Sequence, residues 1–195
     1  VIINSSNDDS GIPNRIYNNS TGTITIKNGE YNIPISNKSS GIINIETGTF
    51  KKIVSNTNTG SINIETGVFN GKISNTNTGT INLKTGTFTN GVESSGNGII
   101  NIGTKGDIND SGELNVSIEN PNITGNTYGL AISKGTVNFY DGIISGTTDA
   151  VNGAISDIED GYEIISGTTE DGKKSKYLSR LPVVEVESTG DTYYT

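Results

Sequence analysis

The stretch TNTGSINIETGVFNGKISN, residues 57–75, is followed at once by TNTGTINLKTGTFTNGVES, residues 76–94. The two phrases share their glycines, an Ile-Asn-Ile or Ile-Asn-Leu centre and a phenylalanine, all nineteen residues apart. A fixed period of this length is typical of solenoid proteins, in which each phrase forms one structural unit. The same period orders the residues on both sides of this stretch.

Aligned on the period, the residues sort into columns of one chemical kind. The opening glycines are Gly22, Gly41, Gly60, Gly79 and Gly98. The apolar columns are Ile24, Ile43, Ile62, Ile81 and Ile100; Ile26, Ile45, Ile64, Leu83 and Ile102; and Ile16, Ile35, Val54, Ile73 and Val92. A second glycine column (Gly29, Gly48, Gly67, Gly86) precedes an aromatic one (Tyr31, Phe50, Phe69, Phe88), and a polar column (Thr25, Asn44, Asn63, Asn82, Asn101) separates the first two apolar columns. Apolar, polar, apolar is the alternation of a strand with one buried face, and β-branched residues favour strands.

A single phrase cannot bury its own apolar side, but stacked phrases can, because each strand pairs with its copy in the next phrase. The sequence therefore predicts an all-β fold: a parallel β-helix (β-solenoid) of about eight coils of roughly 19 residues, over residues 1–182. Further openings are expected at Gly112, Gly135 and Gly153, and residues 167–182 are interpreted as a loop or cap. A thin core of this kind fits a chain in which only 30% of residues are hydrophobic.

Composition and charge exclude several functional classes. Histidine and cysteine are absent, which excludes disulfides and cysteine or histidine chemistry. Residues 105–195 carry 15 acids and 6 bases, so we expect no nucleic-acid partner, because phosphates would be repelled. No apolar run approaches a membrane span, so no membrane insertion is expected in this segment.

The GxINIxxGxF phrases, together with YGLAISKGTVNFYDGIISG (residues 128–146), resemble the right-handed parallel β-helix repeats of bacterial surface proteins. These belong to the pectin lyase-like fold group, and the likeness is to proteins of gut Firmicutes. Right-handedness is implied by the resemblance alone. The tail VVEVESTGDTYYT, residues 183–195, is similar to the opening of another such module, which together with the abrupt VIINSS start suggests a segment of a longer chain; a plain C-terminal strand is the alternative.

Enzymes of that fold group are the obvious catalytic hypothesis. Its hydrolases use paired aspartates, a Gly-His-Gly histidine and an Arg-Ile-Lys motif, of which this chain offers only Asp8-Asp9. Its lyases use calcium with an Arg or Lys base, but Arg15 and Arg180 do not accompany stacked carboxylates. We therefore expect no enzyme activity, no catalytic residue and no cofactor.

Acidic and threonine-rich stretches leave further alternatives. Asp157, Glu159 and Asp160 supply oxygen atoms without EF-hand spacing, so we interpret them as an acidic turn, leaving open whether calcium binds there. Glu46 and Glu65 stack between Lys27 and Lys84, which predicts a structural charge ladder. Threonines 47, 66 and 85, beside Thr49, Val68 and Thr87, are a remote indication of an ice-binding face.

Two tyrosines are candidate ligand contacts. Tyr17 falls in a polar column with Ser36, Ser55 and Ser74, and Tyr140 follows the inward-pointing Phe139, so both are expected to point outward, where rings can stack on sugars. Taken together, these features favour a non-catalytic structural or adhesive module at the bacterial cell surface. Its expected partners are a glycan or a host or matrix protein, and neighbouring modules of the same chain. A carbohydrate-binding or carbohydrate-active β-helix domain is the alternative.

Overall fold

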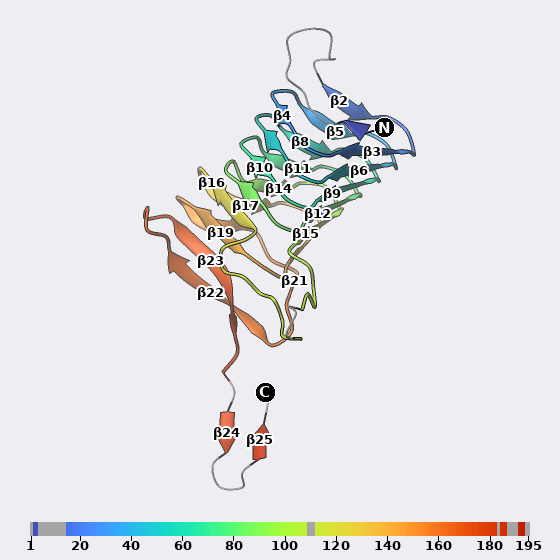
Figure 1. Ribbon diagram of the computed structural model, residues 1–195. Coiled ribbons are helices and arrows are strands. Elements are labelled where there is room, and N and C mark those ends of the chain that lie inside the picture. Colours follow the sequence, from blue (N-terminus) through green and yellow to red (C-terminus); the bar gives the residue numbers. More distant parts are fainter. Residues whose placement is uncertain (1, 4–14, 109–111, 183, 187–190, 194–195) are drawn as a thin grey trace.

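The computed structural model of the chain describes residues 2–3, 15–108, 112–182, 184–186 and 191–193. All regular structure in these residues is β-strand, arranged as coils stacked along one axis (Figure 1). The predicted all-β parallel solenoid is thereby confirmed. No helix in the described part is long and apolar enough to cross a membrane.

Each coil contributes one strand to each of three sheets. Sheet A consists of β1 (Ile2–Ile3), β3 (Thr23–Ile26), β6 (Ile42–Ile45), β9 (Ser61–Ile64), β12 (Thr80–Leu83), β15 (Ile99–Ile102), β18 (Thr136–Phe139) and β21 (Asp157–Ile158). Sheet B consists of β2 (Ile16–Asn18), β5 (Ile35–Asn37), β8 (Val54–Asn56), β11 (Ile73–Asn75), β14 (Val92–Ser94), β17 (Tyr128–Ile132) and β20 (Asp149–Asn152). Sheet C consists of β4 (Glu30–Tyr31), β7 (Thr49–Phe50), β10 (Val68–Phe69), β13 (Thr87–Phe88), β16 (Asn122–Gly125), β19 (Ile143–Gly146), β23 (Lys174–Arg180) and β22 (Tyr162–Thr168).

Up to β15, coils pair in parallel with a register of nineteen residues, which places like residues above one another. Ile43 pairs with Ile62, and Ile62 with Ile81. All three side chains are fully buried, as the predicted apolar columns require. The aromatic column also stacks: ring centroids are 5.0, 4.6 and 4.9 Å apart from Tyr31 through Phe50 and Phe69 to Phe88. Each such pair contributes about 0.5–1.5 kcal/mol beyond its burial.

The glycine column between sheets A and C marks a bend. Gly48 and Gly67 both have φ of 140°, a conformation that residues with a side chain rarely adopt. A Cβ atom at Gly67 would lie 2.8 Å from the carbonyl oxygen of Gly48 in the preceding coil. Glycine therefore allows both the bend and the close approach of successive coils.

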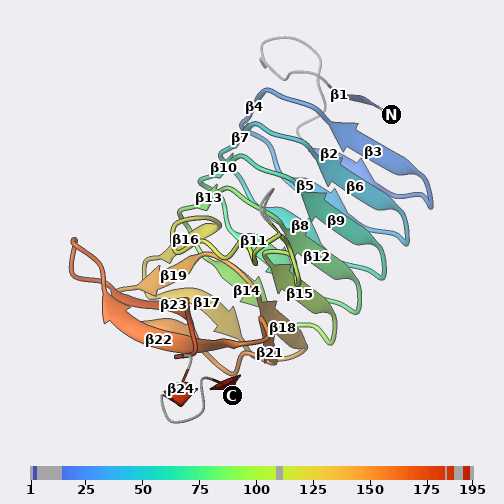
Figure 2. The same cartoon turned by 60° about the horizontal axis from the view of Figure 1, so that its bottom comes forward.

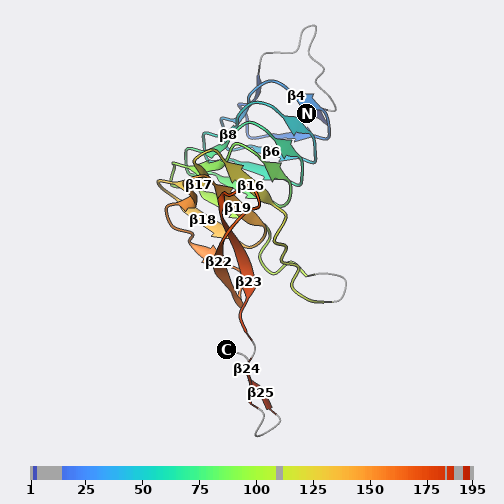
Figure 3. The same ribbon diagram turned by 90° about the vertical axis from the view of Figure 1, so that its left-hand side faces the viewer.

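The expected coil opening at Gly112 is wrong. β15 pairs directly with β18, so Ile100 lies beside Val137, and none of the described residues between Gly103 and Pro121 forms a strand of the three sheets. Leu114 instead forms an isolated antiparallel bridge with Ile108. Residues 103–121 are here called the inserted loop, and its described part projects to one side of the coils (Figure 3). The stack therefore has about seven coils, as the seven strands of sheet B indicate, rather than about eight.

The opening at Gly135 is confirmed, because Val137 and Phe139 are fully buried. The next strand is displaced by one residue from the position that an opening at Gly153 implies. Phe139 pairs with Ile158 rather than with Asp157, which pairs with Asn138. The displacement keeps an apolar side chain on the inner face of sheet A.

Residues expected to form a loop or cap form a hairpin that extends sheet C. β22 and β23 pair with each other, and β23 pairs antiparallel with β19 (Figure 2). Leu178 of β23 is 1% exposed and belongs to the core, so the hairpin covers this end of the stack. In the tail, β24 (Val184–Val186) pairs with β25 (Asp191–Tyr193) as a separate two-stranded sheet. The handedness and the relation of the tail to a further module stay predictions.

Candidate ligand-binding trough on sheet A

The outer face of sheet A carries a ladder of asparagine side chains. Strand alternation points the residue between two core positions outward, and in-register pairing places these residues over one another. The Nδ2 atoms donate to the Oδ1 atoms of the preceding coil: Asn63 to Asn44 at 2.9 Å, and Asn82 to Asn63, Asn101 to Asn82 and Asn138 to Asn101 at 2.8 Å each. The result is a continuous chain of partly buried carboxamides, here called the outer ladder.

Charged side chains stand beside the outer ladder. The Lys84 Nζ atom donates to Glu65 Oε1 at 2.6 Å, and this bond raises the pKa of the lysine. Both side chains are about half exposed, so the pair contributes little to stability. The predicted charge ladder is confirmed for Glu65 and Lys84.

The outer ladder and these charged residues enclose a shallow trough along the stacking axis. Its main part has a volume of about 560 Å³. It is lined by Thr25, Asn44, Ile45, Glu46, Asn63, Ile64, Glu65, Asn82, Lys84 and Thr104. An adjoining hollow of about 380 Å³ shares Asn82, Lys84 and Thr104 and continues to Lys105 and Tyr140.

The inserted loop closes the trough near Tyr140. Lys105 lies 3.1 Å from Asp157 Oδ2 and 3.5 Å from Asp160 Oδ1, and Tyr140 donates its hydroxyl to Asp157 Oδ2 at 3.0 Å. The hydrogen bond from Lys105 lowers the pKa of Asp157, while burial raises the pKa of Tyr140. Glu159 is 4% exposed and accepts the Gly106 amide at 2.8 Å. These contacts fasten the loop to the last two coils.

The acidic turn is thus engaged by the protein itself. Asp157 and Asp160 both face Lys105, and Glu159 binds a backbone amide of the same loop. Within the described residues, no group of three or more acidic side chains is arranged to hold a metal ion. Asp8-Asp9, the other acidic candidate, lies outside the described residues.

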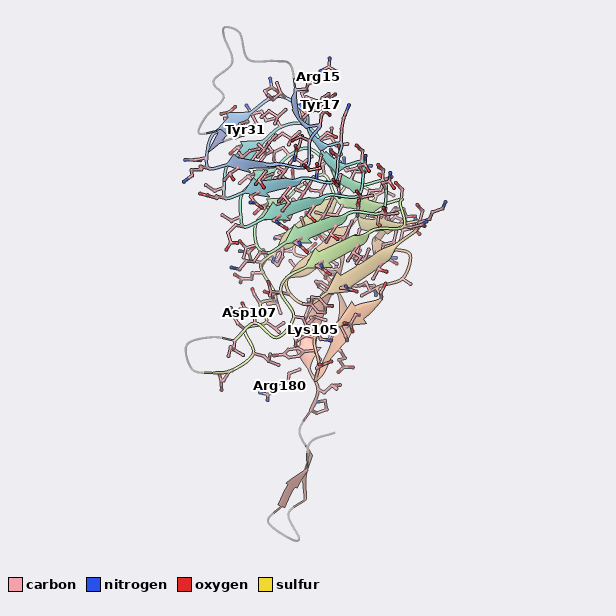
Figure 4. The ribbon with its side chains drawn as sticks, turned by 90° about the vertical axis from the view of Figure 1, so that its right-hand side faces the viewer. Arg15, Tyr17, Tyr31, Lys105, Asp107 and Arg180 are labelled. Carbon is pink, nitrogen blue, oxygen red and sulfur yellow. The ribbon has the colours of Figure 1, made fainter. Side chains whose placement is uncertain are left out.

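The two candidate tyrosines lie far apart along the stack. Figure 4 shows Tyr17 and Arg15 near one end and Lys105, on the inserted loop, toward the other. Tyr17 pairs with Ser36 on the outer face of sheet B, as expected, and Lys38 Nζ lies 3.6 Å from its ring centroid. A hydrogen bond from Arg15 lowers the pKa of Tyr17. A sugar stacking on the ring face that Lys38 occupies would have to displace this lysine.

Tyr140 borders the trough, but its ring is not open. The side chain is 8% exposed, with Lys105 Nζ at 5.7 Å from the ring centroid. The expectation of an exposed ring is therefore wrong for Tyr140, because the inserted loop, which the sequence pattern did not reveal, approaches it. Ligand contact by either tyrosine stays a prediction.

The threonine columns line a different groove. Thr47, Thr49, Thr66, Val68 and Thr87 flank the glycine bend around a hollow of about 410 Å³. Its other lining residues are Asn28, Gly29, Gly48, Gly67, Gly86 and Asn120. The threonines therefore lie on both sides of a bend in the chain.

Sequence reasoning missed a second asparagine ladder inside the solenoid. Asn18, Asn37, Asn56 and Asn75 end the strands of sheet B, and each is at most 2% exposed. Asn37 Nδ2 donates to Gly41 O at 2.7 Å and to Ser61 O, in the next coil, at 3.1 Å. The signal was their strict nineteen-residue spacing, which the neighbouring turn-forming Asn and Thr residues obscured. This inner ladder joins successive coils, and none of its four asparagines lines the trough.

Compared with protein-family models, with curated proteins and with solved structures, the chain matches none. Function must therefore be argued from the geometry of the solenoid and its trough.

Proposed function

We propose that the chain is a rigid, non-catalytic module of an exported bacterial surface protein. It serves as a stalk or display surface that adheres to a partner, either a glycan or a protein of the host or matrix. The observation that carries this proposal is the in-register stacking of like side chains, from Ile43 over Ile62 to Ile81, around one continuous core. A solenoid of this kind has a fixed length and presents long, repetitive outer faces.

Two further features support a role in display. The core continues into the β22–β23 hairpin through Leu178, so this end of the stack is covered. The central outer positions of sheet A are polar and half-buried, with Asn63 and Asn82 as examples, although Ile42 and Ile99 at the starts of their strands are exposed. Such a face suits reversible contact with a hydrated partner.

The carbohydrate-active alternative lacks support from the residues present. The sequence contains no histidine, and Lys84 and Lys105, the basic residues at the trough, are each engaged by a carboxylate. A proton-abstracting lysine would need a lowered pKa, whereas the carboxylates raise the pKa of both.

Two measurements test the proposal. Antibodies against the solenoid are expected to label intact cells of the producing organism, and labelling only after cell lysis would contradict a surface role. Incubation with polygalacturonate and calcium is expected to release no unsaturated product. Release that disappears in a Lys84→Ala variant would establish the enzyme alternative instead.

A further inference from the structure

The outer ladder retains hydrogen-bonding capacity on every rung. A carboxamide has two N–H donors and an oxygen with two lone pairs. Within the ladder, Asn63 uses one N–H toward Asn44 and one lone pair toward Asn82, and Asn82 and Asn101 behave alike. Each of these side chains is half-buried on the trough floor. One donor and one acceptor per coil therefore stay available to a ligand.

These groups recur at the strand spacing of about 4.8 Å along the trough. A ligand chain with hydroxyl groups on each unit satisfies both, because a hydroxyl both donates and accepts. A polypeptide laid along the same line advances about 3.3 Å per residue, so its groups fall out of step with the ladder. A chain bearing only carboxylates or phosphates accepts but does not donate, and leaves the amide oxygens without a donor.

Charge on the trough disfavours an anionic ligand. Lys84 is paired with Glu65, and Lys105 with Asp157 and Asp160. Glu46, which also lines the trough, forms no ion pair with any residue that the structure describes. Of the described residues that line the trough, neither base is left unpaired to attract a polyanion, whereas the carboxylate of Glu46 repels one.

From these observations we propose that the trough binds a neutral, hydroxyl-rich polysaccharide whose chain runs along the stacking axis. Four register steps separate Thr25 from Asn101, which line the two ends of the trough, so the bound chain spans about 19 Å at the strand spacing. Thr104 and Lys105 of the inserted loop limit it near Tyr140. The inference deepens the proposed adhesive function by naming its ligand class and site.

The test uses the whole chain in affinity electrophoresis through gels that contain one polysaccharide each. The neutral probes are hydroxyethyl cellulose, β-1,3-glucan, mannan, xylan and galactan, and polygalacturonate is the anionic comparison. The wild-type chain is expected to be retarded by at least one neutral probe and not by polygalacturonate. Retardation by none of the five neutral probes, or stronger retardation by polygalacturonate, would overturn the proposal.

Variants locate the site. Asn63→Leu removes one rung, and Asn63→Asp keeps its size but removes its N–H donors, so either is expected to weaken binding about tenfold. Ser61→Leu is the matched control, because Ser61 lies on the same strand and the same outer face but outside the trough, and its binding is expected to be unchanged. Melting curves show which variants fold. If Asn63→Leu does not fold, the binding of Asn63→Asp alone tests whether the trough is the site.

Equal binding by wild type and Asn63→Asp would overturn the trough as the site. The proposal would also be overturned if the chain bound a polypeptide partner while none of the neutral polysaccharides retarded it. If antibodies label intact cells, either result contradicts only the trough and not the proposed surface module. If antibodies fail to label intact cells, the surface role is contradicted, but the test of the trough is unaffected.

Discussion

Asn75 on one coil donates from Nδ2 to the carbonyl oxygen of Ile99 on the next coil, at 3.1 Å. The same atom donates to Gly79 O, within its own turn, at 2.8 Å. The side chain is fully buried, and its Oδ1 atom has no hydrogen-bond partner. One amide thus closes a turn and joins two coils, at the cost of a buried acceptor left unpaired.

Asn75→Ala is therefore expected to lower the free energy of unfolding by about 2 kcal/mol. Two buried hydrogen bonds and part of the packing are lost, each at the scale of about 1 kcal/mol, and removal of the unpaired oxygen offsets some of the loss. Urea denaturation measures the change. Asn82→Ala on the half-buried outer ladder is the control and is expected to cost less than about 1 kcal/mol. Equal costs at the two positions would contradict the structural role of the inner ladder.

The inner ladder also explains the opening glycines. A Cβ atom at Gly79 would lie 2.2 Å from Gly60 O and 2.3 Å from Asn56 Nδ2, both in the preceding coil. At Gly22, in the first of these openings, the nearest atom is Ser20 Oγ at 3.4 Å. The requirement for glycine thus arises from the coil beneath rather than from φ, since neither residue has a positive φ.

Gly79→Ala is expected to destabilise the chain by about 3 kcal/mol or more, because the coils must move apart to admit the methyl group. Gly22→Ala is expected to be neutral or slightly stabilising, because open space receives the methyl group and the unfolded chain loses freedom. Thermal unfolding of the two variants beside wild type distinguishes them. Similar melting temperatures for both variants would show that contact between coils does not set the glycine requirement.

The stacked coils could be predicted from the sequence because the same apolar pattern recurs in every phrase. Ile43, Ile62 and Ile81 occupy the same place in successive phrases, so a strand pattern too short to interpret once becomes decisive when it recurs. The polar column of Asn63 and Asn82 could be placed on the outer face by the same alternation.

Other features depend on contacts that no local pattern encodes. Asn56 and Asn58 stand two residues apart in the same Asn-Thr-Asn-Thr run, yet Asn56 is fully buried in the inner ladder and Asn58 is a half-buried turn residue. Turn propensity describes both equally well. Gly112 was misread because a single glycine-led phrase carries no test of register, and the pairing of β15 with β18 is what excludes it. Because this segment was interpreted as a coil rather than a loop, its approach to Tyr140 was not predicted either.

The inserted loop is expected to be dispensable for the solenoid. Three residues join Leu83 to Thr87, whereas nineteen join Ile102 to Asn122 at the equivalent place. Replacing residues 103–121 by Lys-Thr-Gly, copied from residues 84–86, is expected to leave the β15–β18 ladder intact, because none of its pairs involves the loop. Hydrogen exchange should show unchanged protection in β15 and β18. Loss of protection there would mean that the loop holds the two coils together.

The loop anchors are expected to respond to pH in opposite directions. Burial raises the pKa of Asp141 to about 6, from an ordinary value of 3.8. Asp107 and Glu159 nearby raise this pKa as well, while the Ser117 and Gly142 amides that Asp141 accepts lower it. A folded-state pKa above the unfolded value means that the folded chain binds the proton more tightly. The contribution of Asp141 to stability is therefore greatest below pH 4 and falls as the pH rises through 6.

Relative to Asp141→Asn, which keeps the Oδ1 atom that accepts both amides, wild type should lose on the order of 1 kcal/mol between pH 4 and pH 7, since solvent screens a partly exposed carboxyl. Asp157 is the counterpart, because Lys105 lowers its pKa and its contribution is lost as the pH falls through that lowered value. Urea denaturation of wild type and Asp141→Asn between pH 4 and pH 7 measures the first effect, and the same comparison with Asp157→Asn, carried to below the ordinary carboxyl pKa of 3.8, measures the second. A difference between wild type and Asp141→Asn that stays constant with pH would show that the burial of Asp141 does not shift its titration.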